Sequence, residues 1–149
     1  MVPENRELRG RIDELLADVP SEGWKHRILA SLQAIELLFR LTLQRSEVVR
    51  SSLDPAEIWV SALDELDIPQ AAGVLREHGT GMPPVTVLLI RGRHYLFMGS
   101  LRALAYALAG RRVDSIIADV SRAGRLASMV TEASLTLGTV LSRSKPYAK

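Results

Sequence analysis

The chain has 149 residues, of which 47% are apolar, enough for one compact domain with a packed core. It contains no cysteine, which excludes a disulfide framework, a thiolate metal site and a cysteine nucleophile. The three histidines are far apart, and no two have the spacing of metal ligands on a helix, so we expect no metal site. The N-terminal segment is polar, and the richest apolar run is interrupted by Gln33, Glu36 and Arg40. We therefore expect a cytoplasmic protein with no membrane partner.

The formal net charge of +2 conceals an asymmetry between the two halves of the chain. Residues 1–79 carry 9 Lys and Arg against 14 Asp and Glu, whereas residues 80–149 carry 10 against 3. This distribution favours a polyanionic or phosphorylated partner for the C-terminal half. Alternatively, the two halves pack against each other and neutralise one another.

Two helices are predicted at the N-terminus, over residues 4–18 and from residue 21 to about residue 50, because apolar residues recur there at spacings of three and four. The second helix would be roughly 45 Å long, which is longer than a small domain is wide. Its broad apolar stripe needs cover either from a sheet of the same chain or from the same helix of another subunit. Residues 24–45 are therefore a candidate homo-oligomer contact.

The polar segment 51–55 is the predicted boundary between a helical extension, residues 1–50, and a second domain, residues 51–149. After this segment, Ile58–Val60 predicts a short strand and residues 70–78 predict a helix.

The most regular pattern lies between residues 83 and 120. It predicts the strand Val85–Ile90, the turn Arg91-Gly92, the strand Arg93–Met98, a helix from Ser100 to a stop at Gly110, and a strand over 113–118. The first strand is apolar on both faces, so we expect a sheet that is covered on both sides. Residues 121–142 predict a further helix with a weak point at Gly138.

The junction at Gly99, Ser100, Leu101 and Arg102 passes from a strand to a helix N-terminus, where backbone N–H groups have no helical partner. A phosphate can accept hydrogen bonds from these groups, from the Ser100 hydroxyl and from the Arg102 guanidinium. Tyr106 lies one turn further on the same helix face and is a candidate to shield Arg102 or to stack on a base.

An alternative reading gives this junction a purely structural role. In it, Arg102 pairs with a carboxylate such as Asp119 or Glu65, and Tyr106 is an ordinary packing residue. The residues themselves leave both readings open.

The pattern Gly-x-x-Arg-x-x-Ala at 99–105, between two strands, resembles the ParB/sulfiredoxin-like fold. This fold is seen in the N-terminal domain of chromosome-partition ParB proteins, in sulfiredoxins and in archaeal free-serine kinases. The segment Ile58–Val60, with Leu63 and Leu66, and the Pro-Pro-containing segment 82–87 are also similar to the family, so the resemblance covers roughly residues 57–120. The predicted fold class is α+β, with an N-terminal helical extension followed by a small mixed sheet with flanking helices.

The resemblance implies nucleotide phosphate binding at Gly99, Ser100 and Arg102. Partition ParB proteins bind cytidine triphosphate with this domain, and the other two groups bind adenine nucleotides. A sulfiredoxin reaction is excluded, because Ser100 occupies the position of its cysteine. The polar centre of the serine kinases is absent, and only Gly99 and Arg102 match it. The DNA-reading domain of the partition proteins would need more chain than residues 121–149.

Two classes of function follow. The first is a non-catalytic ParB-like protein that binds a nucleotide or nucleic acid through a basic face made of Arg91, Arg93, His94, Arg102, Arg111 and Arg112. The second is a small ATP- or ADP-dependent phosphotransferase or nucleotide hydrolase of the same fold. In it, Glu65 or Asp67 would act as a general base or through Mg²⁺ bound with the nucleotide.

Overall fold

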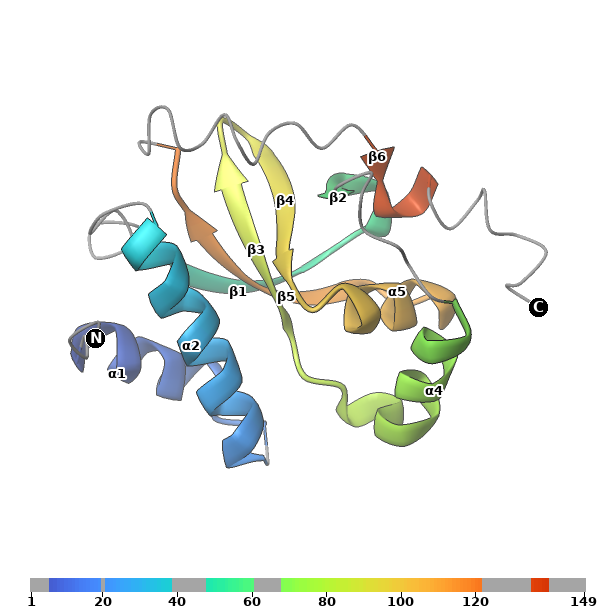
Figure 1. The fold of residues 1–149 in the computed structure, drawn as a ribbon, viewed down its shortest axis with the longest axis horizontal. Helices are drawn as coiled ribbons and strands as arrows, with labels where there is room; N and C mark the ends of the chain where they lie inside the picture. The colour runs from blue at the N-terminus through green and yellow to red at the C-terminus, as the bar shows by residue number, and fades with distance from the viewer. Residues whose placement is uncertain (1–5, 20, 39–47, 61–67, 122–134, 140–149) are drawn as a thin grey trace.

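The computed structural model (Figure 1) describes residues 6–19, 21–38, 48–60, 68–121 and 135–139, called the described residues below. Its helices and strands are, in chain order, α1 (Arg6–Leu15), α2 (Glu22–Leu38), β1 (Val48–Leu53), β2 (Ile58–Val60), α4 (Ile68–His78), β3 (Val85–Ile90), β4 (Arg93–Met98), α5 (Ser100–Leu108), β5 (Val113–Asp119) and β6 (Leu135–Thr136). None of the described helices has both the length and the apolar character that a membrane crossing needs.

The strands form one six-stranded mixed sheet in the order β1-β5-β3-β4-β2-β6. The pairs β3–β5 and β2–β4 are parallel, and the pairs β1–β5, β3–β4 and β2–β6 are antiparallel. The turn between β3 and β4 places Arg91 at φ 51° and Gly92 at φ 84°, the pair of positive angles that suits a two-residue hairpin. The mixed α+β class predicted from the sequence is confirmed.

Helices cover both faces of this sheet, as Figure 1 shows, with α1 and α2 on one side and α4 and α5 on the other. Leu88 and Ile90 of β3 belong to the hydrophobic cluster under α1 and α2, whereas Val85 and Val87 belong to the cluster under α4 and α5. The prediction that this strand is buried on both faces is therefore confirmed. An interior strand carries a nearly continuous run of apolar side chains, because neither face meets water.

The apolar stripe of α2 is buried within the chain. Ile28, Leu32 and Ile35 are almost fully buried in the cluster that α2 shares with α1 and the sheet. The sequence left open whether this stripe is covered by the same chain or by another subunit, with 24–45 as the candidate contact. Over the described part of α2 the same chain covers it, and residues 39–45 lie outside the described residues.

The structure differs from the sequence prediction at β1. Residues 48–50, predicted as the end of a long second helix, belong to this strand, and so do residues 51–53, predicted as part of a polar break. The physical reason is that β1 is an edge strand. It pairs with β5 along one of its edges, and several of its side chains are exposed and polar. The predicted division into a helical extension, 1–50, and a second domain, 51–149, stays a prediction. Strand β1 runs across residue 50, and α1 and α2 share a hydrophobic cluster with the sheet.

A second difference lies near the C-terminus. Leu135–Thr136, placed by prediction within a helix, form β6 and pair antiparallel with β2. Residues 137–139 of that predicted helix are helical, and its residues 122–134 and 140–142 lie outside the described residues.

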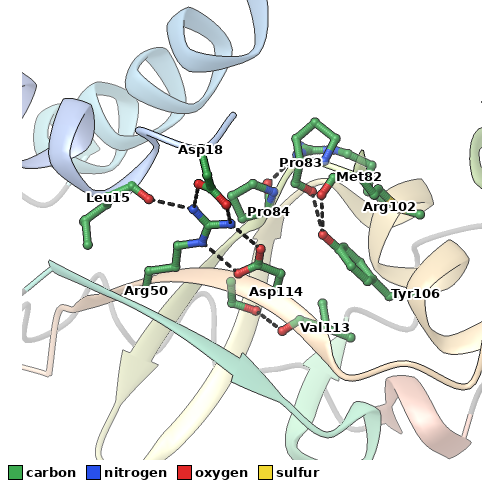
Figure 2. Close-up of polar contacts among 11 residues, drawn as sticks. Leu15, Asp18, Arg50, Met82, Pro83, Pro84, Arg102, Tyr106, Val113 and Asp114 are labelled. Atoms are coloured by element: carbon green, nitrogen blue, oxygen red, sulfur yellow. Dashed lines mark hydrogen bonds and ion pairs between the residues drawn. The ribbon is translucent and has the colours of Figure 1, made fainter. Parts of the chain in front are cut away.

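Arg50 ties the N-terminal helices to the sheet (Figure 2). Its guanidinium donates to both carboxylate oxygens of Asp114 on β5, at 3.0 and 2.6 Å. It also donates to the Asp18 carboxylate and, at 2.7 Å, to the carbonyl of Leu15 at the end of α1. The hydrogen bonds to Asp114, ahead of those to Asp18, raise the pKa of Arg50 above its ordinary value. This side chain therefore has its charge compensated inside the fold.

Candidate anion-binding cleft

The N-terminus of α5 carries free hydrogen-bond donors. Gly99 is the single residue between β4 and α5 and is the N-cap of the helix, with φ 97° and no side-chain cap hydrogen bond. The first intrahelical bond runs from Ala103 N to Gly99 O at 2.8 Å. The backbone N–H groups of Ser100, Leu101 and Arg102 donate to no group among the described residues.

Glycine is required at this junction for two reasons. A positive φ of this size is strained for any residue with a side chain. A Cβ atom on Gly99 would also lie 2.8 Å from Arg102 Nη2 and 3.0 Å from Val85 Cγ1. The glycine thus lets the chain turn sharply while the Arg102 side chain folds back over it.

Arg102 has no carboxylate partner within the part of the chain that the structure describes. Its Nη1 donates to the carbonyl of Pro84 (Figure 2), and its Cζ lies 4.4 Å from the ring centroid of Trp24 on α2. Burial lowers the pKa of Arg102 to about 10; the Tyr106 hydroxyl opposes this shift and the Arg27 charge adds to it. The guanidinium is still charged at neutral pH, at a cost of ~3 kcal/mol relative to water.

Trp24 brings three elements together beside this arginine. The Cζ of Arg27 lies 4.9 Å from its ring centroid, and the ring of His78, the last residue of α4, meets it edge-on at 5.7 Å. Trp24 is held at the start of α2, where its backbone N–H donates to the Ser21 hydroxyl at 3.4 Å. Neither Arg27 nor Arg102 forms an ion pair with any described residue.

An open cleft of about 1010 Å³ lies between α2, the end of α4 and the start of α5. Small-molecule sites commonly measure ~300–1,000 Å³, so this cleft can accept a ligand of nucleotide size. Its polar lining consists of Ser21, Trp24, Arg27, Ser31, Glu77, His78, Ser100 and Arg102, and its remaining lining consists of Gly23, Ile28, Ala30, Ala34, Val74, Phe97, Met98, Gly99 and Leu101.

The four residues predicted to bind phosphate, Gly99, Ser100, Leu101 and Arg102, all line this cleft. The alternative in which Arg102 pairs with Asp119 is wrong, because the Asp119 carboxylate accepts from the backbone N–H and hydroxyl of Ser121. Glu65 and Asp67, the catalytic candidates, lie outside the described residues.

The stacking role predicted for Tyr106 is wrong. Its side chain is only 1% exposed, and its hydroxyl donates to the carbonyls of Met82 at 2.6 Å and Pro83 at 3.2 Å (Figure 2). Burial raises the pKa of Tyr106 to about 12, and Arg111 lies over the ring at 4.9 Å. Apolar positions along one helix face do not reveal whether that face points to the core or to a ligand, and here it points to the core.

The predicted basic face does not exist as one surface. Arg91 lies at the β3–β4 turn, where its backbone N–H donates to Ser121, just after β5, whereas Arg112 lies just before β5. Ser121 is nine positions after Arg112, a span of roughly 30 Å along a strand. Two of the other predicted members have local side-chain contacts: Arg93 Cζ lies 4.7 Å from the centroid of the Trp59 ring, and Arg111 donates to Gly79 O at 3.0 Å. His94 lies on β4, where its backbone is in register with Ile58 of β2.

The sequence alone did not reveal Trp24, Arg27 and His78 as site residues. A faint signal exists on α2, where Gly23, Arg27 and Ala30 follow one another at spacings of four and three opposite the apolar stripe. That signal shows which helix face avoids the core, but it does not show that α5 begins beside it.

No family model, curated protein or solved structure matches this chain. Among the described residues, no group of three or more His, Asp or Glu side chains is placed to hold a metal ion.

Proposed function

We propose that the protein binds a nucleotide, with the phosphates at the N-terminus of α5. The observation that carries this proposal is the pair of guanidiniums, Arg27 and Arg102, which share the Trp24 ring without an ion-pair partner among the described residues. Three free backbone N–H groups and the Ser100 hydroxyl line the same cleft. An anion there would be stabilised by the helix dipole and by charge-assisted hydrogen bonds of ~1.5–3 kcal/mol each before desolvation.

A single nucleotide fits these observations better than a long nucleic acid. The free cations converge in a cleft, whereas the surface arginines expected to track a phosphate backbone lie at opposite ends of β5. A nucleic-acid groove typically follows the phosphate backbone with a run of positive charge, because neutralising the phosphates supplies much of the affinity.

The ParB/sulfiredoxin-like fold is part of this proposal. The order β2, α4, β3, β4, α5, β5 and the start of α5 directly after Gly99 support it. The proposed role is non-catalytic binding, since the described lining of the cleft supplies one carboxylate, Glu77. A phosphotransferase or hydrolase activity draws no support from the described residues.

Fluorescence titration tests the proposal directly, because the chain has two tryptophans, Trp24 and Trp59, and only Trp24 lines the cleft. In a Trp59→Phe background, Trp24 is the sole reporter, and we expect ATP or CTP to change its emission in a saturable way. Arg102→Met should weaken the nucleotide affinity ~10–100-fold, because one charge-assisted contact is lost.

Arg93→Met, compared with Arg102→Met by calorimetry in the chain that keeps Trp59, is the matched control. Arg93 lies over the Trp59 ring as Arg102 lies over Trp24, but it is not part of the cleft, so this variant should bind within about twofold of the parent protein. Titration of a DNA duplex at two salt concentrations separates the other ligand class, because nucleic-acid binding falls steeply with salt. Equal affinities of the two arginine variants, or binding of the duplex without the nucleotide, would contradict the proposal.

A further inference from the structure

The cleft has two chemically different ends along α2. At the first end, Arg27, Arg102 and His78 surround Trp24. Further along the helix, the lining side chains of α2 are those of Ala30, Ser31 and Ala34. The rise of 1.5 Å per residue places Ala34 roughly 15 Å beyond Trp24, so the polarity of the cleft changes over the length of one small ligand.

The second end offers no free hydrogen-bonding side chain on α2. Ser31 is the one polar residue of α2 that lines this end. Its hydroxyl donates to Ile28 O at 2.8 Å and forms a second hydrogen bond, 3.0 Å long, with the Thr86 hydroxyl. Glu77 and His78 come from the end of α4, and the His78 ring is fixed beside Trp24 at the cationic end.

The end of β4 that lines the cleft is also apolar. Phe97 and Met98, the last residues of β4, line the cleft, and the Met98 side chain is 49% exposed. Met98, Ala30 and Ala34 all line the cleft and give it an apolar surface without branched side chains. Such a surface can contact the face of a planar ring, and none of these three side chains can hydrogen-bond to the ring's edge.

Building on the nucleotide function proposed above, we infer that the base lies with its face against Ala30, Ala34 and Met98 and its edge toward solvent. The site therefore recognises the charged phosphates together with a planar ring, and it does not distinguish one base from another. Stacking is tolerant of base identity because every base has a π-face, whereas discrimination needs hydrogen bonds to the edge.

The first test compares ATP, GTP, CTP, UTP and inorganic tripolyphosphate by calorimetry on the full chain. We expect the four nucleotide dissociation constants to agree within about threefold, and each nucleotide to bind about tenfold more tightly than tripolyphosphate. Discrimination of more than about tenfold among the bases would overturn the inference while leaving the nucleotide function in place.

The second test fills the apolar end with Ala34→Leu, a change that suits an exposed helix position. We expect all four nucleotides to lose about tenfold in affinity, toward that of tripolyphosphate, while tripolyphosphate binding stays within about twofold. Ala109→Leu, at the far end of α5 and outside the cleft, is the control and should change neither.

The outcomes separate the two proposals. Unchanged nucleotide affinity in Ala34→Leu, or an equal loss for tripolyphosphate, would overturn the placement of the base and leave the phosphate site standing. Failure of both nucleotides and tripolyphosphate to bind the parent protein would overturn the nucleotide function and the base placement together.

Discussion

Two arginines, Arg50 and Arg102, lie in neighbouring parts of the fold and have opposite surroundings (Figure 2). Arg50 contacts two carboxylates and one carbonyl, and its pKa is raised. Arg102 contacts one carbonyl and one aromatic ring, and burial lowers its pKa. The comparison teaches that the partners of a cation indicate its role better than its burial does. Arg50 completes the native structure, whereas Arg102 keeps an uncompensated charge at the edge of a cleft.

The largest expected effect comes from Arg50→Met. Removing this guanidinium leaves Asp114 and Asp18 without their cation, so the free energy of unfolding should fall by ~2–3 kcal/mol. Arg102→Met removes a buried charge that has no carboxylate partner, so it should change that free energy by less than ~0.5 kcal/mol or raise it. Urea unfolding of both variants measures the difference, and equal losses would mean that Arg102 is also a structural cation.

Gly99→Ala sharpens the comparison from the side of Arg102. The positive φ should cost ~1–2 kcal/mol of stability, and the new Cβ should displace the Arg102 guanidinium and weaken nucleotide binding several-fold. Gly92→Ala is a matched control, because Gly92 also has a positive φ but a Cβ there meets nothing within 4 Å. Its stability loss should be similar and its nucleotide affinity unchanged; a similar affinity loss in both would contradict the role of the Arg102 position.

The smallest expected effect is a loss of folding stability at acidic pH. The hydrogen bond from Arg50 lowers the pKa of Asp18 below its ordinary value of 3.8. Because this pKa is lower in the folded state than in the unfolded state, the stabilisation by the Asp18 carboxylate is complete above about pH 4. It is lost as the pH falls through the folded-state pKa. Because Asp18 is exposed, the loss should be below ~1 kcal/mol. Urea unfolding at pH 5 and below pH 3 should show a smaller pH dependence in Asp18→Asn than in the parent, and identical dependences would argue against this contact.

The segment from β3 to β5 could be predicted from the sequence because its signals are local. A run of apolar residues, the Arg91-Gly92 turn and the glycines at 99 and 110 each specify the backbone where they stand. The strand β1 could not, because its polar residues resemble a loop until the pairing with β5 is known.

The part of the site on α5 was predictable because its signals are also local in the sequence. The free N–H groups at Ser100 and Leu101 follow from a helix that begins after a glycine. Trp24 and His78 reach the cleft only because α2 and the end of α4 meet at one end of the sheet. Nothing in the spacing of residues within either helix specifies that meeting, since it depends on how both helices pack.

The buried contact between Ser31 and Thr86, 3.0 Å between hydroxyl oxygens, joins α2 to the middle of the sheet. An apolar stripe alone specifies the rotation of a helix only loosely, whereas a buried hydrogen bond between two short hydroxyl side chains favours the rotation at which they meet. Seven residues earlier on the same helix, that rotation decides which way the Trp24 ring faces. The orientation of the aromatic ring beside Arg102 therefore depends on a pair of small side chains at the helix–sheet interface.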